Sequence, residues 1–291
     1  MKIAIVTDST ANLTEEECKA WGISVVPLYL NLGSASYLDG VELSSEEFYK
    51  RMKDENTLPT TSQPSPGLFL ETFERLLKTH DCVVAVLLSG KLSGTVHSAE
   101  TARDLLCTER IHVIDSQVVE YALGALVLEM AKAVRLADEQ GTVCDVQGLV
   151  ERMAQIRAEM HMYIAMDSLE NLRLGGRIGA AAALLGSMMQ IKPVIWLSDG
   201  QVGVFEKVRT YKKAVDSIMS RMFEQMRNAG PCEIMLIHSV TDLDVVRRWV
   251  DTVKEALPEA RVSYRMLAPI VGVHVGFGGL GAIYYARCEA Q

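Results

Sequence analysis

Short runs of β-branched and aliphatic residues alternate with helical patterns through the first half of this chain, and this alternation constrains the fold most. Strands separated by helices in this order are typical of a parallel sheet with right-handed crossovers. The expected strands are Ile3–Val6, Val25–Leu30, Cys82–Leu88 and Ile111–Ile114, and the expected helices start near Thr14 and Ser65 and span Thr95–Leu106, Tyr121–Glu139 and Asp145–Met160. We therefore expect an α/β protein whose N-terminal parallel sheet is flanked by helices.

Two of these helices carry recognisable start signals. Thr14 and Glu17 have the spacing of a capping box, in which each residue satisfies a backbone N–H of the other. Ser65 followed by Pro66 places an N-cap hydroxyl before a proline that is pre-set for the first helical position. Both patterns predict where a helix begins.

The second half of the chain has a different pattern. Asp199-Gly200 stands between two apolar runs and predicts a two-residue hairpin turn. A hairpin within an α/β pattern indicates a mixed or largely antiparallel second sheet with helices. Its expected strands are Met162–Met166, Pro193–Leu197, Val202–Val208, Ile234–Ile237, Val262–Met266 and Gly281–Ala286, and its helices include Ala180–Gln190 and Asp244–Ala256. We expect two domains, one over residues 1–160 and the other over residues 161–291.

Composition excludes several classes of protein. Hydrophobic residues make up 49% of the 291 positions, and the net charge of −8 argues against nucleic acid as an electrostatic partner. The six cysteines form no Cys-x-x-Cys pair, as in a reduced cytosolic protein without a zinc site. The first residues read as a strand and not as a signal peptide, and the longest apolar run, Ala122 to Leu128, is too short to span a bilayer. We expect a cytoplasmic protein that holds no metal.

Polar loops follow the expected strands of the first half. They are Asp8-Ser9-Thr10, Ser89 to Thr95, Asp115-Ser116-Gln117 and the Thr60–Ser65 loop that precedes a helix. In a parallel sheet such loops meet at the edge where ligands bind. Thr61, Ser89, Ser93 and Ser116 exceed what helix capping needs, which favours an anion or carboxylate site over caps alone. Lys91 is either a charge partner of that site or a solvated loop lysine.

A second candidate is His274, which lies among five glycines between Gly272 and Gly281. Glycine tolerates positive φ and close backbone approach, and this density weakens regular structure. His274 is therefore either a ligand-contacting residue or a core histidine in a tight bend. The chain has no P-loop, no Gly-x-Gly-x-x-Gly after its first strand, no His-Glu-x-x-His and no Gly-x-Ser-x-Gly. It offers an anion site without evident machinery to transform the anion.

Eight short motifs occur in an order that resembles the DegV family. They are Thr7-Asp8-Ser9, Thr61-Ser-Gln-Pro-Ser65, Lys91-Leu-Ser-Gly-Thr95, Asp115-Ser116, Leu174-Gly-Gly-Arg-Ile178, Ile191-Lys-Pro193, Arg209-Thr210 with Lys212-Lys213, and Gly272 to Gly281. Each motif is weakly specific, but the ordered set is highly specific and extends from about residue 3 to residue 287.

The resemblance implies a two-domain carrier of a long-chain fatty acid such as palmitate or oleate, without catalytic activity or a cofactor. Its carboxylate would bind Thr61, Ser93 and His274 at the domain interface, and its tail would lie in an apolar tunnel of the C-terminal domain. Arg177 and Arg209 would face the head group or a partner. The implied partner is a fatty acid kinase that forms acyl-phosphate for phospholipid synthesis. The last loop departs from the family pattern at Val273, Val275 and Phe277, where Thr, Thr and Pro are common.

Apolar residues of the second half are candidates for the tunnel. The segment from Ala180 to Met189 is apolar almost all round, and further methionines stand at positions 160, 162, 166, 219, 222 and 226. Methionine adapts to a flexible alkyl chain, but it serves equally in an ordinary core. The alternative function is a phosphotransferase or hydrolase that acts on a small phosphorylated compound at the same loops; a third is a regulatory module that binds only a protein. Transient membrane contact stays open, and a monomer is the default.

Overall fold

A computed structural model describes residues 1–54, 58–183, 191–239 and 242–286. The chain divides into two compact units, each described here by itself. The first consists of Met1–Arg157 with Ala268–Val271, and the second of Ala158–Leu267 with Gly272–Gln291. The short stretch Ala268–Val271, which lies within the expected C-terminal domain, therefore groups with the N-terminal unit.

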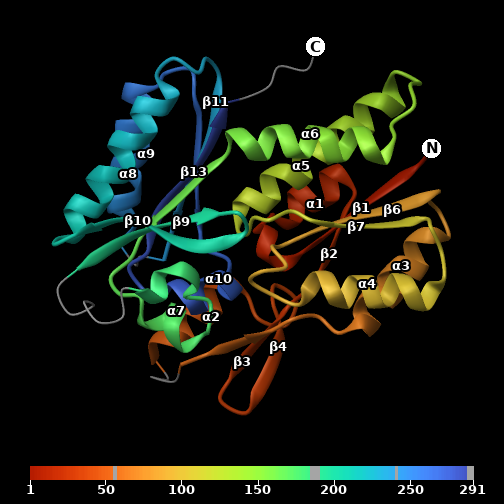
Figure 1. Cartoon of the computed structure of the whole chain (residues 1–291), viewed down its shortest axis with the longest axis horizontal. Coiled ribbons are helices and arrows are strands. Elements are labelled where there is room, and N and C mark those ends of the chain that lie inside the picture. Colours follow the sequence, from red (N-terminus) through yellow and green to blue (C-terminus); the bar gives the residue numbers. More distant parts are fainter. Residues whose placement is uncertain (55–57, 184–190, 240–241, 287–291) are drawn as a thin grey trace. The chain divides into compact units, whose positions relative to one another are not determined.

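The first unit is built on a parallel sheet, as predicted. Within the described residues its strand order is β2-β1-β6-β7, and all three pairings are parallel. These strands are β1 (Ile3–Asp8), β2 (Ile23–Val26), β6 (Cys82–Leu87) and β7 (Ile111–Asp115), and the helices are α1 (Glu15–Trp21), α2 (Ser45–Asp54), α3 (Pro66–Leu77), α4 (Thr95–Leu106), α5 (Tyr121–Glu139) and α6 (Val146–Glu159) (Figure 1). Strand β6 is buried along its whole length, as its continuous apolar sequence predicts.

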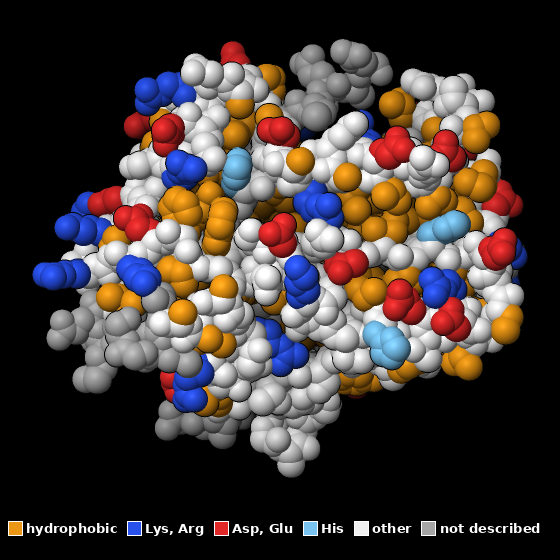
Figure 2. Space-filling view, in the orientation of Figure 1, with side chains coloured by type: hydrophobic (Ala, Val, Ile, Leu, Met, Phe, Trp, Pro, Cys, Tyr) orange, Lys and Arg blue, Asp and Glu red, His pale blue; other side chains and the backbone are white. Residues whose placement is uncertain are grey.

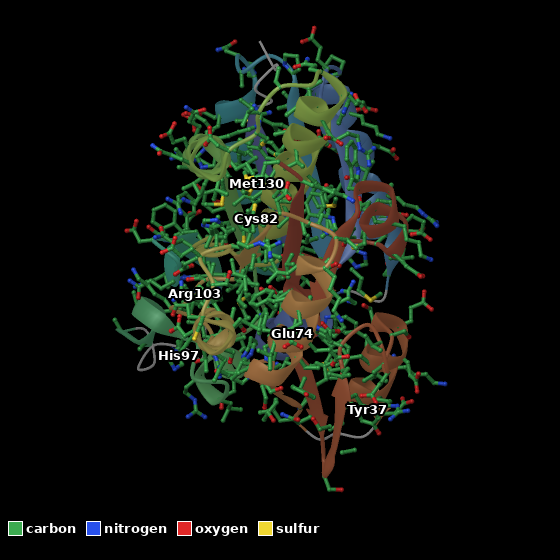
Figure 3. The ribbon with its side chains drawn as sticks, turned by 90° about the vertical axis from the view of Figure 1, so that its right-hand side faces the viewer. Tyr37, Glu74, Cys82, His97, Arg103 and Met130 are labelled. Carbon is green, nitrogen blue, oxygen red and sulfur yellow. The ribbon has the colours of Figure 1, made fainter. Side chains whose placement is uncertain are left out.

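Helices cover both faces of this sheet. Phe69 and Phe73 of α3 are fully buried against Val6 of β1 and Val83 of β6. Helix α5 lies on the other side, where a Cβ at Gly124 would meet the backbone oxygen of Ala11 at 2.2 Å. Buried side chains such as Cys82 and Met130 fill the interior of this unit in Figure 3.

The capping predictions are confirmed. The Thr14 side chain accepts from the N–H of Glu17, and the Glu17 carboxylate accepts from the N–H of Thr14. The Ser65 hydroxyl accepts from the N–H of Leu68 at the start of α3. These local hydrogen bonds are visible in the sequence because they join residues only three positions apart.

The expected strand Val25–Leu30 is wrong, because it is divided at Pro27. Proline has no N–H to donate to a strand pairing. Strand β2 ends at Val26 in the parallel sheet, and the chain continues into a separate antiparallel sheet of order β4-β3-β5. Its strands are β3 (Tyr29–Leu32), β4 (Ala35–Leu38) and β5 (Thr60–Ser62). Tyr37, labelled in Figure 3, lies on β4 beneath the guanidinium of Arg51 at 5.3 Å.

The second unit contains a mixed sheet, as the Asp199-Gly200 hairpin predicts. Its described strands have the order β10-β9-β8-β13-β11-β12, in which only β11 and β12 pair in parallel. The strands are β8 (His161–Ala165), β9 (Lys192–Ser198), β10 (Gln201–Val208), β11 (Cys232–His238), β12 (Arg261–Met266) and β13 (Leu280–Ala286), and the helices are α7 (Glu170–Leu174), α8 (Tyr211–Met226), α9 (Leu243–Ala256) and α10 (Pro269–Val275). The first three residues of α10, up to Val271, belong to the first unit. Asp199 and Gly200 both have positive φ, at 48° and 77°, as the predicted turn requires.

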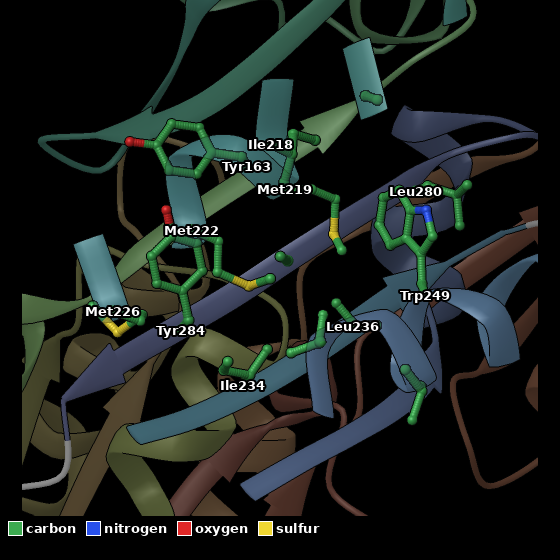
Figure 4. Close-up of a cluster of buried hydrophobic side chains, with 14 of the residues drawn as sticks. Tyr163, Ile218, Met219, Met222, Met226, Ile234, Leu236, Trp249, Leu280 and Tyr284 are labelled. Carbon is green, nitrogen blue, oxygen red and sulfur yellow. The ribbon is translucent and has the colours of Figure 1, made fainter. Parts of the chain in front are cut away.

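Methionines of α8 belong to the core of the second unit. Met219, Met222 and Met226 project from one face of α8 toward the sheet, where they pack with Tyr163 and Tyr284 (Figure 4). Residues 184–190 of the expected apolar helix lie outside the described residues. The part that is described, residues 179–183, forms a 3-10 helix.

Acidic and basic side chains are interspersed over the face seen in Figure 2. In the part of the chain that the structure describes, no helix is both long and apolar enough to cross a bilayer.

Candidate functional site

Thr61 and Ser93 lie on neighbouring segments of the first unit. Thr61 is in β5, where it pairs with Leu30 of β3. Ser93 precedes α4, and its hydroxyl is 2.9 Å from that of Thr95. The two segments are joined by Gln63, whose Nε2 donates to the Ser98 hydroxyl at 2.9 Å. The loop with Thr61 and the loop with Ser93 thus meet through one side chain.

Gly94 permits this close approach. A Cβ at Gly94 would lie 2.0 Å from the Gln63 side-chain oxygen, so any other residue would displace Gln63. The residue directly before Gly94 is Ser93, and the residue two before Gln63 is Thr61. The Gln of the Thr-Ser-Gln-Pro motif and the Gly of the Leu-Ser-Gly-Thr motif therefore fit each other.

Ser89 and Ser116, two of the hydroxyl residues that helix capping does not account for in the sequence, have hydrogen-bond partners nearby in the chain. Ser89 is fully buried, and its hydroxyl accepts from the N–H of Lys91 at 3.2 Å. Ser116 is also fully buried, and its hydroxyl donates to the carbonyl of Val118 at 3.3 Å. Turn geometry accounts for both, and Ser93 likewise has a local partner in Thr95.

His274 lies near the end of α10, although the glycine content of this region argued against a regular helix. Its ring packs against Gly175, where an added Cβ would come within 2.3 Å of the His274 Nδ1. Burial, followed by the positive charge of Arg177, lowers the pKa of His274 to about 4. The imidazole is therefore neutral at pH 7, with one nitrogen as a donor and the other as an acceptor.

Arg177 is held next to this histidine. Its Nη1 donates to the carbonyl of Gly175 at 2.6 Å. One turn earlier, the Asn171 amide donates to the carbonyl of Val273 at 3.3 Å. The Leu-Gly-Gly-Arg-Ile motif is thus packed against the glycine-rich loop within the second unit.

The glycine-rich loop is fixed by two residues that the sequence motifs did not indicate. The buried Ser239 hydroxyl donates to the carbonyl of Gly276 at 2.6 Å and accepts from the N–H of Gly279 at 2.9 Å. The Tyr211 hydroxyl donates to the carbonyl of Gly278. Ser239 directly follows the end of β11, a position where polar residues often serve a site, and this signal was available in the sequence.

Arg209 stands two residues before Tyr211, between β10 and α8, and is exposed. The candidate residues therefore fall into two sets. Thr61 and Ser93 belong to the first unit, while Arg177, Arg209 and His274 belong to the second.

Chemically, the residues of each set suit an anion with oxygen acceptors. Hydroxyls and a neutral imidazole donate hydrogen bonds, and a guanidinium adds a positive charge. Among the described residues, no group of three His, Cys, Asp or Glu side chains is arranged to hold a metal ion.

Comparisons with known proteins agree with this set of motifs. The model of a family described as "Uncharacterised protein, DegV family" matches residues 2–287. A DegV domain-containing protein of Halalkalibacterium halodurans is 38% identical over 287 residues, which cover 98% of this chain and 98% of that protein.

Two solved structures share the fold over the whole chain. A DegV family protein from Thermus thermophilus, described with its fatty acid binding, is 31% identical with a TM-score of 0.88, and the match covers 99% of this chain and 100% of that one. DegV from Bacillus subtilis, described as a fatty acid binding protein, is 28% identical with a TM-score of 0.90 and the same coverage. The family match over nearly the whole chain, together with the 38% identical relative, shows that this chain belongs to the DegV family.

Proposed function

We propose that this protein binds one long-chain fatty acid, with Thr61, Ser93 and His274 on the carboxylate and the acyl tail in an apolar tunnel of the second unit. The observation that carries the proposal is the likeness, over 99% of the chain, to two DegV proteins described as binding fatty acids. A structure from Eubacterium ventriosum, 25% identical with a TM-score of 0.84, is described as a stearic acid-binding protein.

The chemistry of the head-group residues supports a ligand that stays available for reaction. Hydroxyls and a neutral imidazole hold a carboxylate by single hydrogen bonds, whereas a bidentate arginine pair would occupy both of its oxygens. Affinity then comes from the tail, because burying about fourteen methylenes at ~0.8 kcal/mol each gives roughly 11 kcal/mol before the costs of association. The head-group contacts orient the ligand.

A carboxylate held in this way suits transfer to a second protein. We propose that the protein presents the fatty acid to a separate fatty acid kinase, which forms the acyl-phosphate. Arg177, whose guanidinium is fixed by the Gly175 carbonyl, would face the head group, and the exposed Arg209 would face the head group or the partner. The protein itself then acts as a carrier and not as an enzyme.

The first test is mass spectrometry of an organic extract from the denatured, freshly purified protein. We expect one fatty acid per chain. A protein that is empty and also takes up neither palmitate nor oleate would contradict the proposal and favour action on a small phosphorylated compound.

The second test examines the hydroxyls. The double variant Thr61→Ala, Ser93→Ala should lower the yield of acyl-phosphate in the presence of a fatty acid kinase and ATP by at least about tenfold, the equivalent of one charge-assisted hydrogen bond. Thr252→Ala, on the exposed side of α9, is the matched control. Unchanged lipid occupancy and unchanged acyl-phosphate yield in the folded double variant would refute the assignment.

A further inference from the structure

The first unit contains a cavity of about 330 Å³ beside β1, β2 and α1, away from Thr61 and Ser93. This volume is within the range of small-molecule sites and holds roughly ten water-sized groups. Leu13, Ile23, Val25 and Pro27 contribute apolar walls. The cavity is a candidate site that the fatty acid proposal does not use.

Two buried carboxyl groups lie in this cavity. Asp8 is fully buried and Asp39 is 4% exposed. Asp8 accepts from the N–H of Thr10 at 3.0 Å, from the Thr10 hydroxyl at 2.5 Å and from the N–H of Leu88 at 2.7 Å, which occupies three of its roughly four acceptor positions. Asp39 hydrogen-bonds with the Ser9 hydroxyl. Asp39 is therefore the carboxyl group with the larger oxygen capacity for a ligand.

The charge of the lining has one sign. None of the described residues that line the cavity is Lys, Arg or His. Glu15 at its edge is exposed and pairs with Lys19 at 2.5 Å, so the uncompensated carboxyl groups are Asp8 and Asp39. Buried carboxyl groups are costly without a compensating charge. A cationic ligand would supply that charge. A bare metal ion fits less well, because it prefers a shell of oxygen ligands and the apolar walls provide none.

We propose that this cavity binds a small organic ammonium compound with a compact aliphatic body, whose ammonium group pairs with Asp39. The aliphatic part packs on Leu13, Ile23 and Val25, and the ammonium donates to the carboxylate of Asp39. Asn12 also lines the cavity, with its amide donating to Glu120. This site is independent of the fatty acid proposal, since it shares no residue with it.

The pH dependence of binding follows from the groups around Asp39. Burial and the nearby charge of Asp8 raise the pKa of Asp39 to about 7, against the effect of the Ser9 hydrogen bond. The phenol of Tyr49 on α2 also interacts with Asp39, and it stays neutral because burial, followed by the charges of Glu120 and Asp39, raises its pKa well above the ordinary value. Glu15 lines the same cavity. An ammonium requires the ionised form of Asp39, so its affinity should rise between about pH 6 and about pH 8.

The test uses three probes that share the 3-methylbutyl group, on the full chain at about pH 8: 3-methylbutylammonium, neutral 3-methylbutanol and anionic 4-methylpentanoate. Titration calorimetry should show millimolar or tighter binding of the ammonium, and at least about tenfold weaker binding of the other two. Amide resonances of Ser9, Asn12 and Asp39 should shift on addition of the ammonium, which places it in this cavity.

Asp39→Asn tests the contact itself, with the exposed Asp138→Asn as the matched control. We expect Asp39→Asn to lower ammonium affinity by at least about tenfold, with unchanged fatty acid content by mass spectrometry. Asp138→Asn should change neither. Absence of ammonium binding at millimolar concentration, equal binding of the alcohol, or full affinity in folded Asp39→Asn would each overturn the proposal.

Discussion

The carboxylate of Glu120 accepts a hydrogen bond from the backbone N–H of Ala268 at 3.0 Å, and so links two residues that are 148 positions apart. Its other oxygen accepts from the Asn12 amide. Glu120 is fully buried and has φ 64° and ψ −160°, a backbone region that is essentially reserved for glycine. Ala268 directly precedes α10, the helix that carries His274, so Glu120 fixes where this helix begins.

Two substitutions of Glu120 should distinguish the effect of its hydrogen bonds from the effect of its backbone strain. Glu120→Ala leaves the buried Ala268 N–H without its acceptor and should lower the free energy of unfolding by about 1–3 kcal/mol. Glu120→Gly loses the same hydrogen bonds but relieves the backbone strain, and should therefore be less destabilising than Glu120→Ala. Urea unfolding of both variants measures the difference, and a glycine variant as unstable as the alanine variant would contradict the role of strain.

A methyl group at Gly175 should displace His274. The added Cβ would lie 2.3 Å from Nδ1 and 2.7 Å from Cε1 of the ring, while the φ of −77° suits alanine. We expect Gly175→Ala to stay folded, to shift the imidazole resonances of His274 and to lose acyl-phosphate formation with a kinase. Gly148→Ala, where the nearest side-chain atom is 3.5 Å away, is the control that should change neither.

Ser239 should be required for the order of the glycine-rich loop. Ser239→Ala removes both the donor to the Gly276 carbonyl and the acceptor for the Gly279 N–H at a site that is 3% exposed. We expect a loss of about 1–3 kcal/mol in the free energy of unfolding. Ser220→Ala on the exposed face of α8 should be neutral. Hydrogen exchange of Gly276 and Gly279 should accelerate in Ser239→Ala, and unchanged protection would argue against this role.

His274 should make the lipid-free protein less stable in acid. The folded pKa of about 4 lies below the ordinary value of 6.5, so the unfolded chain binds the proton first. The contribution of the neutral His274 to the free energy of unfolding is complete above pH 6.5. It falls by at most about 3 kcal/mol as the pH decreases from 6.5 toward 4. The free energies of unfolding of the wild type and of His274→Gln, measured as a function of pH, should converge over this interval. A constant difference between them would mean that the folded state does not shift the pKa of His274.

Asp39 should have the opposite effect. Its folded pKa of about 7 lies above the ordinary 3.8, so the folded state retains a proton that the unfolded chain releases. The contribution of Asp39 to the free energy of unfolding is therefore complete below pH 3.8 and is lost as the pH rises through 7. Asp39→Asn should be more stable than the wild type at about pH 8 and similar at about pH 4. Equal stability at both pH values would show that Asp39 is already compensated in the wild type.

Local patterns in the sequence predicted much of the fold. Helix α4 spans Thr95–Leu106 as expected, and α5 spans Tyr121–Glu139, because continuous apolar periodicity marks both. The split at Pro27 was not foreseen, since the apolar run continues on both sides of the proline. Helix α10 was not foreseen either. Glu120 accepts from the N–H of Ala268, directly before this helix, and no periodic pattern records a contact across 148 positions.

Part of the candidate site could be proposed from the sequence, because its motifs are local patterns. The motifs of Thr61, Ser93, Arg177 and His274 are short and local, so they can be read directly from the chain. Ser89 and Ser116 have the residue type of ligand-binding hydroxyls, and the sequence does not show that each forms a hydrogen bond with a residue two positions away. Gln63 and Gly175 owe their importance to packing against Gly94 and His274, which spacing alone does not reveal.

The position of β13 has a consequence for how this protein is made. Strand β13 lies between β8 and β11, yet it follows both in the chain. During synthesis, β8 and β11 each present an unpaired edge until residues 280–286 have left the ribosome, and the first unit likewise waits for Ala268–Val271. The six-stranded sheet of the second unit therefore closes only after the last strand in the chain has been made.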